Sequence, residues 1–136
     1  MGRAVIYMLD THTCIYIINQ RPPQVRAHFE GLHYGAVVVS SITGAELAFG
    51  VAKSGSPRNQ DALEKFLAPL EVLPFRFGGD VRLRRATRPT PGKRTARWCP
   101  VDTLIAANAL TVDATLVTNK LAEFDRVPRL ACENWV

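Results

Sequence analysis

The sequence predicts an α/β domain built around a mostly parallel central sheet. The first sign is a set of short, uninterrupted apolar runs, such as residues 5–9 and 36–39, which are typical of strands buried on both faces. The second sign is that each run leads through polar residues into a segment with helical character. Strands that alternate with helices along a chain usually form a parallel sheet whose faces are covered by the helices.

Length and composition favour one globular domain. The chain has 136 residues, of which 47% are hydrophobic, enough for a sizeable core. No apolar run approaches the roughly 20 residues that a membrane span needs, and the first run ends at Asp10 rather than at a secretory cleavage site. Cys14, Cys99 and Cys132 are scattered and odd in number, which favours reduced thiols. We therefore expect a cytoplasmic protein without a membrane segment.

Strands and helices are expected to alternate before residue 76. Pro22 and Pro23 stop the helix that follows the first strand, and Pro74 breaks the third strand. The second strand contains Ala and three Val residues and is fully apolar. The expected elements are, in order, a strand ending at 9, helices at 14–19 and 24–30, a strand at 36–39, helices at about 44–52 and 57–67, and a strand at 71–75.

Regular structure is expected again from Pro100 onward. An Ala- and Leu-rich helix spans about 103–110, and the fourth strand, 115–118, follows it. A short helical turn at 121–125 and a last edge strand at 131–135 complete the chain. These elements continue the alternation of the first part, so they belong to the same sheet.

Three acidic residues occupy comparable places in this pattern. Asp10 follows the first strand, Glu46 is expected in the first turn of the helix after the second strand, and Asp102 begins a later helix. Parallel strands deliver the chain to one edge of the sheet, so the fold can bring these distant residues into one pocket. Clustered carboxylates repel each other unless a cation neutralises them, and Mg²⁺ or Mn²⁺ is the natural partner.

Each acid also has a purely structural interpretation. Asp is a good N-cap, and an acid in the first turn of a helix stabilises the helix dipole. For Asp10, Glu46 and Asp102, the sequence positions alone leave both interpretations open.

Four sequence blocks contain these acids or the strand ends near them. They read MLDTHTCIYII, SSITGAELAFGVAKS, PVDTLIAANAL and, at the end of the chain, ATLVTN with EF and ENW further on. Together, and in this order, they resemble the VapC-type toxins of the PIN-domain family. His12 stands where that family usually has Asn, whereas Thr43, Glu46, Gly50 and Asp102 match its pattern.

The resemblance implies a PIN-like three-layer α/β/α sandwich and a Mg²⁺-dependent endoribonuclease, with Mn²⁺ as the alternative ion. It implies that Asp10, Glu46 and Asp102 are catalytic and that Asp10 and Asp102 hold the metal. A metal-activated water would hydrolyse the RNA phosphodiester without a covalent enzyme intermediate.

The resemblance is incomplete after the fourth strand. Members of the family often carry a fourth acid just past a Leu-Val-Thr strand, where this chain has Asn119 and Lys120. Glu123 is the nearest substitute. Thr11, Thr118 and Asn119 are expected to support the site from the strand ends, although the two threonines are equally good caps.

Residues 76–99 also depart from the family, which has an amphipathic helix there. Eight of the 17 Lys and Arg residues lie between Arg76 and Arg97, with Asp80 as the one acid, so the net charge of +5 is local. Within a single domain spanning 1–136, we expect this segment to be solvated or disordered. The alternative is a pair of compensating frameshifts, because codons chosen for the segment and read one nucleotide later can encode an amphipathic helix.

The resemblance further implies the toxin of a type II toxin–antitoxin system. Its partners would be an RNA substrate, a cognate VapB-like antitoxin that folds on binding, and a second copy of the chain in a homodimer. The alternative function is a catalytically impaired PIN-like domain that only binds RNA or an antitoxin. The missing fourth acid and the atypical segment favour that alternative.

Overall fold

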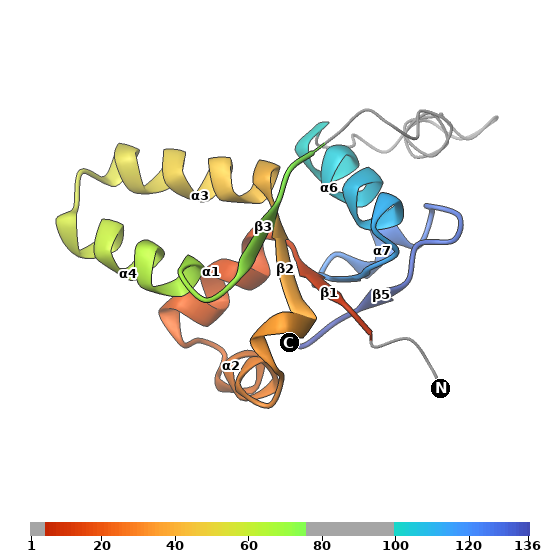
Figure 1. Cartoon of the computed structure of the whole chain (residues 1–136), viewed down its shortest axis with the longest axis horizontal. Helices are drawn as coiled ribbons and strands as arrows, with labels where there is room; N and C mark the ends of the chain where they lie inside the picture. The colour runs from red at the N-terminus through yellow and green to blue at the C-terminus, as the bar shows by residue number, and fades with distance from the viewer. Residues whose placement is uncertain (1–4, 76–99) are drawn as a thin grey trace.

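A single five-stranded parallel sheet forms the centre of the molecule (Figure 1). The computed structural model describes residues 5–75 and 100–136. The strand order is β3-β2-β1-β4-β5, and all four neighbouring pairs are parallel. The strands are β1 (Tyr7–Leu9), β2 (Val37–Ser40), β3 (Glu71–Leu73), β4 (Thr115–Val117) and β5 (Cys132–Glu133). The predicted α/β class with a mostly parallel sheet is confirmed.

Helices cover both faces of this sheet. Figure 1 shows α3 and α4 on one side of the strands and α6 and α7 on the other, which gives the predicted three-layer α/β/α sandwich. The helices on the first side and around it are α1 (Thr11–Asn19), α2 (Pro23–Glu30), α3 (Ser41–Ser54) and α4 (Pro57–Leu67). The second side carries α6 (Pro100–Thr111) and α7 (Leu121–Phe124), and a short 3-10 helix, Tyr34–Ala36, precedes β2.

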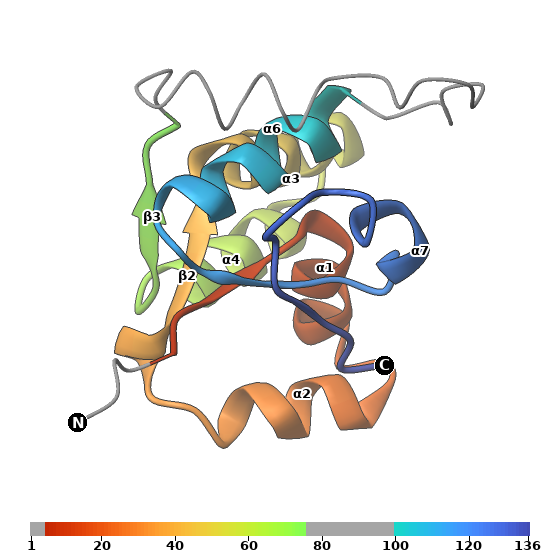
Figure 2. The same cartoon turned by 90° about the vertical axis from the view of Figure 1, so that its right-hand side faces the viewer.

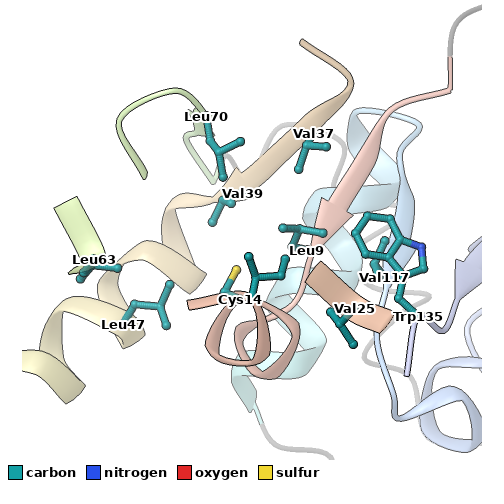
Figure 3. Packing of buried hydrophobic residues seen from close by; sticks show 11 residues of the cluster. Leu9, Cys14, Val25, Val37, Val39, Leu47, Leu63, Leu70, Val117 and Trp135 are labelled. Atoms are coloured by element: carbon teal, nitrogen blue, oxygen red, sulfur yellow. The ribbon is translucent and has the colours of Figure 1, made fainter. Parts of the chain in front are cut away.

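The central strands β1, β2 and β4 divide their side chains between two hydrophobic cores. Leu9 and Val117 point into the core beneath α1 to α4 (Figure 3), whereas Met8 and Leu116 join the core beneath α6 and α7. Successive side chains on a strand face opposite sides, so a strand buried on both faces must be apolar throughout. This is why the strands appear in the sequence as uninterrupted apolar runs.

Three helices begin three residues earlier than the sequence predicted. Helix α1 begins at Thr11 rather than at residue 14, and α3 begins at Ser41 rather than at about residue 44. The side chains of Asp10 and Ser40 accept hydrogen bonds from the first turns and thereby fix these starts. Helix α6 begins at Pro100, a residue type that suits the first helical position. As a result, Glu46 lies in the second turn of α3, so its predicted place in the first turn was wrong.

The segment 76–99, with both of its interpretations, lies outside the described residues. Within the ranges 5–75 and 100–136, no helix combines the length and the apolar character needed to cross a bilayer.

Candidate active site

The strand order predicts a ligand-binding site between the carboxyl ends of β1 and β4. The chain runs outward from β1 in one direction to β2 and β3 and in the other to β4 and β5. Ligands of open α/β sheets bind at such a switch point, outside the carboxyl ends of the strands. Asp10 follows β1 directly, and Thr118, Asn119 and Lys120 follow β4. Helices α3 and α6 lie at the same edge, the one to which β2 points (Figure 2).

Asp10 is a buried carboxylate, 2% exposed, that is fixed mainly by backbone groups. Its Oδ1 accepts a 2.8 Å hydrogen bond from the Thr13 backbone N–H, which makes Asp10 the N-cap of α1. Its own N–H donates to the Val117 carbonyl at 3.0 Å, and the Thr13 hydroxyl donates to the same carbonyl at 3.1 Å. The capping interpretation is therefore correct. The cap engages one carboxylate oxygen, and within the described part of the chain the second oxygen has no hydrogen-bond partner and can face a ligand.

Glu46, on α3, is held in place by a side chain of α1. The Thr11 hydroxyl donates a hydrogen bond of 2.5 Å to Glu46 Oε1, although 35 residues separate the two along the chain. Thr11 is next to Asp10 in sequence, so this bond brings the second acid to the same edge of the sheet. The predicted supporting role of Thr11 corresponds to this contact.

Asp102 lies in the first turn of α6 and is 9% exposed. Its Oδ2 accepts a hydrogen bond from the Lys120 ammonium, with a nitrogen-to-oxygen distance of 3.2 Å. The Thr118 hydroxyl accepts a 3.0 Å hydrogen bond from the Lys120 N–H and so orients the residue that carries this ammonium. Thr118 therefore acts as a cap for the turn after β4.

Several acids influence the pKa of the Lys120 ammonium. Partial burial lowers the pKa of the Lys120 ammonium, but the hydrogen bond and charge of Asp102 outweigh it. The charges of Glu123 and Asp10 act in the same direction, so the pKa of Lys120 rises above its ordinary value. Asp10 and Asp102, from opposite ends of the chain, thus act on one ammonium group.

Asn119 and Glu123 were predicted to support the site, but the side chains of both are exposed. Asn119 is exposed, and its side-chain amide donates to the Tyr16 hydroxyl at 2.9 Å, which ties the end of β4 to α1. Glu123 is exposed on α7 and reaches the site only through its charge. Among the described residues, no group of three His, Cys, Asp or Glu side chains lies close enough to hold a metal ion. Asp10 and Asp102 remain the buried pair of carboxylates.

Sequence reasoning missed two contributions to the site. Thr13 fixes the Asp10 carboxylate through its backbone N–H and ties α1 to Val117 through its hydroxyl, and the only sequence signal for it is a hydroxyl residue three positions after a capping Asp. Thr43 was recognised as part of a motif, but its structural role was not: its Oγ1 is buried and has no hydrogen-bond partner within the described ranges. Thr43 precedes Glu46 by three residues on α3 and so shares a helix face with it.

An apolar cavity of about 220 Å³ opens beside the acids. It lies between α1, α3 and α4, and Thr11 and Glu46 form its polar end. Its apolar walls include Ile15, Leu47 and Leu63, of which Ile15 is 38% exposed. Asn19 at the end of α1 and Asn59 on α4 add further polar groups to the lining.

Comparison with known proteins identifies this arrangement. The PIN domain family model matches residues 7–130. "Ribonuclease VapC2" of Rickettsia felis is 38% identical over 138 residues, covering 96% of this chain and 98% of that protein. The "tRNA(fMet)-specific endonuclease VapC" of Salmonella typhimurium is 37% identical over 135 residues, covering 95% and 97%.

Two solved structures agree with the sequence comparison. The chain resembles one in the VapBC2 complex of Rickettsia felis bound to a promoter DNA fragment, with a TM-score of 0.82 and 36% identity. It resembles one in DNA-bound VapBC of Salmonella typhimurium with a TM-score of 0.84 and 35% identity. These matches cover 97% of this chain and nearly all of each of the others. The chain therefore belongs to the PIN domain family and, within it, to the VapC ribonucleases.

Proposed function

We propose that this chain is a Mg²⁺-dependent endoribonuclease that acts as the toxin of a type II toxin–antitoxin pair. The observation that carries the proposal is that two buried carboxylates, Asp10 and Asp102, both act on the Lys120 ammonium at the switch point of a VapC-type PIN domain. PIN-domain ribonucleases generally depend on a divalent metal, and Mn²⁺ is the alternative to Mg²⁺ here.

The residues at the site fit a hard divalent cation. Asp10 and Asp102 each engage one oxygen in a hydrogen bond, and neither second oxygen has a hydrogen-bond partner among the described residues. A buried carboxylate is costly unless a cation or hydrogen bonds compensate its charge. The ammonium of Lys120 already lies at this position, so the local field favours positive charge. Mg²⁺ commonly binds one or two carboxylates and completes its shell with water and substrate oxygens.

In the proposed reaction, Asp10 and Asp102 would hold the metal beside the scissile phosphate. A bound Mg²⁺ would supply charge stabilisation at the phosphate and lower the pKa of a water molecule. Glu46, held through one oxygen by Thr11, uses its other oxygen to take the proton from the attacking water. The water displaces the ribose oxygen in line, so no covalent bond to the protein forms.

The proposed partners follow from the relatives. The solved relatives are VapBC complexes, so we propose a VapB-like antitoxin as the binding partner of this chain. The apolar cavity between α1, α3 and α4, with Phe49 of α3 72% exposed, offers surface for an apolar segment of such a partner. We also propose that the chain forms a homodimer and works in the cytoplasm.

One observation favours the alternative function, a catalytically impaired domain that only binds RNA or an antitoxin. Lys120 lies where the family often has a fourth acid, and its ammonium is bonded to Asp102. If this ion pair excludes the metal, the fold remains able to bind partners while the chemistry is lost.

RNA cleavage by the purified chain separates the two functions. The first substrate is tRNA(fMet), which is named for the Salmonella relative, with bulk tRNA and ribosomal RNA alongside. We expect cleavage with Mg²⁺, none with EDTA, and a loss of at least about 100-fold in Asp102→Asn, as expected when a metal ligand is removed. Asp61→Asn, at an exposed position on α4, is the matched control and should retain full activity. A folded wild-type chain that cleaves none of these RNAs with either metal would establish the alternative.

A further inference from the structure

Lys120 is placed as a cation inside the acidic pocket. Its ammonium lies 3.2 Å from Asp102 Oδ2, and the two side chains are 31% and 13% exposed. The neighbouring hydroxyl of Thr118 fixes the backbone of Lys120 at the end of β4. Both partners are therefore partly buried, unlike the exposed pair of Lys65 and Asp61 on α4, whose side chains are 78% and 61% exposed.

The ammonium faces more than one acid. The charges of Asp10 and Glu123 also act on Lys120, so it lies within the field of the acids that a divalent ion would use. Lysine is charged at neutral pH, and two charges within a few ångström interact strongly in a partly buried site. A divalent ion that binds Asp102 must therefore displace the ammonium or tolerate its repulsion.

We infer that the Lys120 ammonium competes with the divalent metal for Asp102 in the acidic pocket. This competition weakens metal binding. This inference rests on the proposed function, because it takes Asp10 and Asp102 as the metal ligands. It goes beyond that function by assigning a regulatory role to a residue of this chain. Metal binding is then coupled to release of the Lys120 side chain from Asp102.

Calorimetric titration with Mg²⁺ and Mn²⁺, without RNA, tests this competition directly. Lys120→Met removes the charge and keeps most of the length, Lys120→Glu reverses the charge, and Lys120→Arg retains it. We expect metal affinity to rise about tenfold in Lys120→Met, the effect of one nearby charge in a partly exposed site, and further in Lys120→Glu. Lys120→Arg and the matched control Lys65→Met should bind metal as the wild type does.

A second measurement uses the unaltered chain and does not depend on how the variants fold. Acetylation of Lys120 by an amine reagent is followed by mass spectrometry with EDTA and with saturating Mg²⁺, with Lys65 as the internal reference. We expect Lys120 to react several-fold faster with Mg²⁺, because the metal releases its ammonium from Asp102. Lys65, whose partner Asp61 is on α4 and is not one of the proposed metal ligands, should react equally in both conditions.

Several outcomes would overturn the inference. Unchanged or weaker metal affinity in folded Lys120→Met, or Lys120 acetylation that is unchanged or slower with Mg²⁺, would show that the ion pair is only structural. Absence of metal binding in every variant would also overturn it. The proposed function is tested separately by RNA cleavage with the wild-type chain, so a chain that cleaves RNA but fails these tests loses only the inference.

Discussion

The two halves of the candidate site are held in different ways. The amino-terminal half, which comprises Asp10, Thr11 and Glu46, is fixed by a helix cap, a strand-end backbone bond and a short hydroxyl contact. The carboxyl-terminal half, Asp102 and Lys120, is joined by one contact between two side chains. Backbone groups cannot move without unfolding a turn, whereas a lysine changes rotamer readily. The first half is therefore preorganised, and the second half can respond to a ligand.

The largest expected effect comes from separating the two roles of Asp10. Asp10→Asn keeps an N-cap but removes the charge, so we expect RNA cleavage to fall at least about 100-fold with little loss of stability. Asp10→Ala removes both, so activity falls similarly and the free energy of unfolding falls by about 1 kcal/mol. Cleavage assays and urea denaturation measure the two effects. If Asp10→Asn retained wild-type activity, Asp10 would be a cap alone and not a ligand.

A smaller effect is expected when the contact between α1 and α3 is removed. Thr11→Val keeps the shape of the side chain but cannot donate to Glu46, so the carboxylate loses its orientation. We expect kcat for RNA cleavage to fall about tenfold, as when an outer-shell partner is lost. Thr111→Val, at an exposed position near the end of α6, is the matched control and should leave kcat unchanged. An unaltered kcat in Thr11→Val would mean that Glu46 needs no help from α1.

Thr13 provides a test of stability without a change of charge. Thr13→Val removes a buried hydrogen bond to the Val117 carbonyl, which still accepts one from the Asp10 N–H. We expect the free energy of unfolding in urea to fall by about 1 kcal/mol, the usual value of one buried hydrogen bond. A loss no larger than that of Thr111→Val would show that the link between α1 and β4 does not stabilise the amino-terminal half.

The smallest expected effect concerns the reactivity of the Cys132 thiol on the edge strand β5. Burial, together with the charge of Asp125, raises the pKa of the Cys132 thiol to about 11. The neutral thiol is thus favoured in the folded state, so its stabilising contribution is present at neutral pH and lost as the pH rises toward about 11. Alkylation of Cys132, read by mass spectrometry, should be slow at pH 8 and accelerate up to that pH. Fast alkylation of the folded chain at pH 8 would contradict this assignment.

The fold was predictable because its central strands are buried on both faces. The runs that became β1, β2 and β4 contain almost only apolar residues, a pattern that few other arrangements produce. Helix starts were less predictable, since Asp10 and Ser40 begin their helices through side-chain hydrogen bonds rather than through apolar periodicity. These three-residue errors moved Glu46 from the first to the second turn of α3.

The acids of the site were predictable from position, but their contacts were not. Asp10 and Asp102 stand at element ends that a parallel sheet brings to one edge. The bond between Lys120 and Asp102 joins a residue after β4 to one on α6 and depends on a rotamer that no local pattern specifies. The same is true of Thr11 and Glu46, which lie 35 residues apart.

The central position of β1 also affects when activity can arise during synthesis. Tyr7 pairs with Val37 on one side and with Thr115 on the other, so β1 is complete only when nearly the whole chain is available. Pairing between distant segments is slow and comes late in folding. A nascent chain on the ribosome therefore has Asp10 long before β4 and Lys120 emerge to complete the pocket. Translation itself thus delays the appearance of a nuclease inside the cell that makes it.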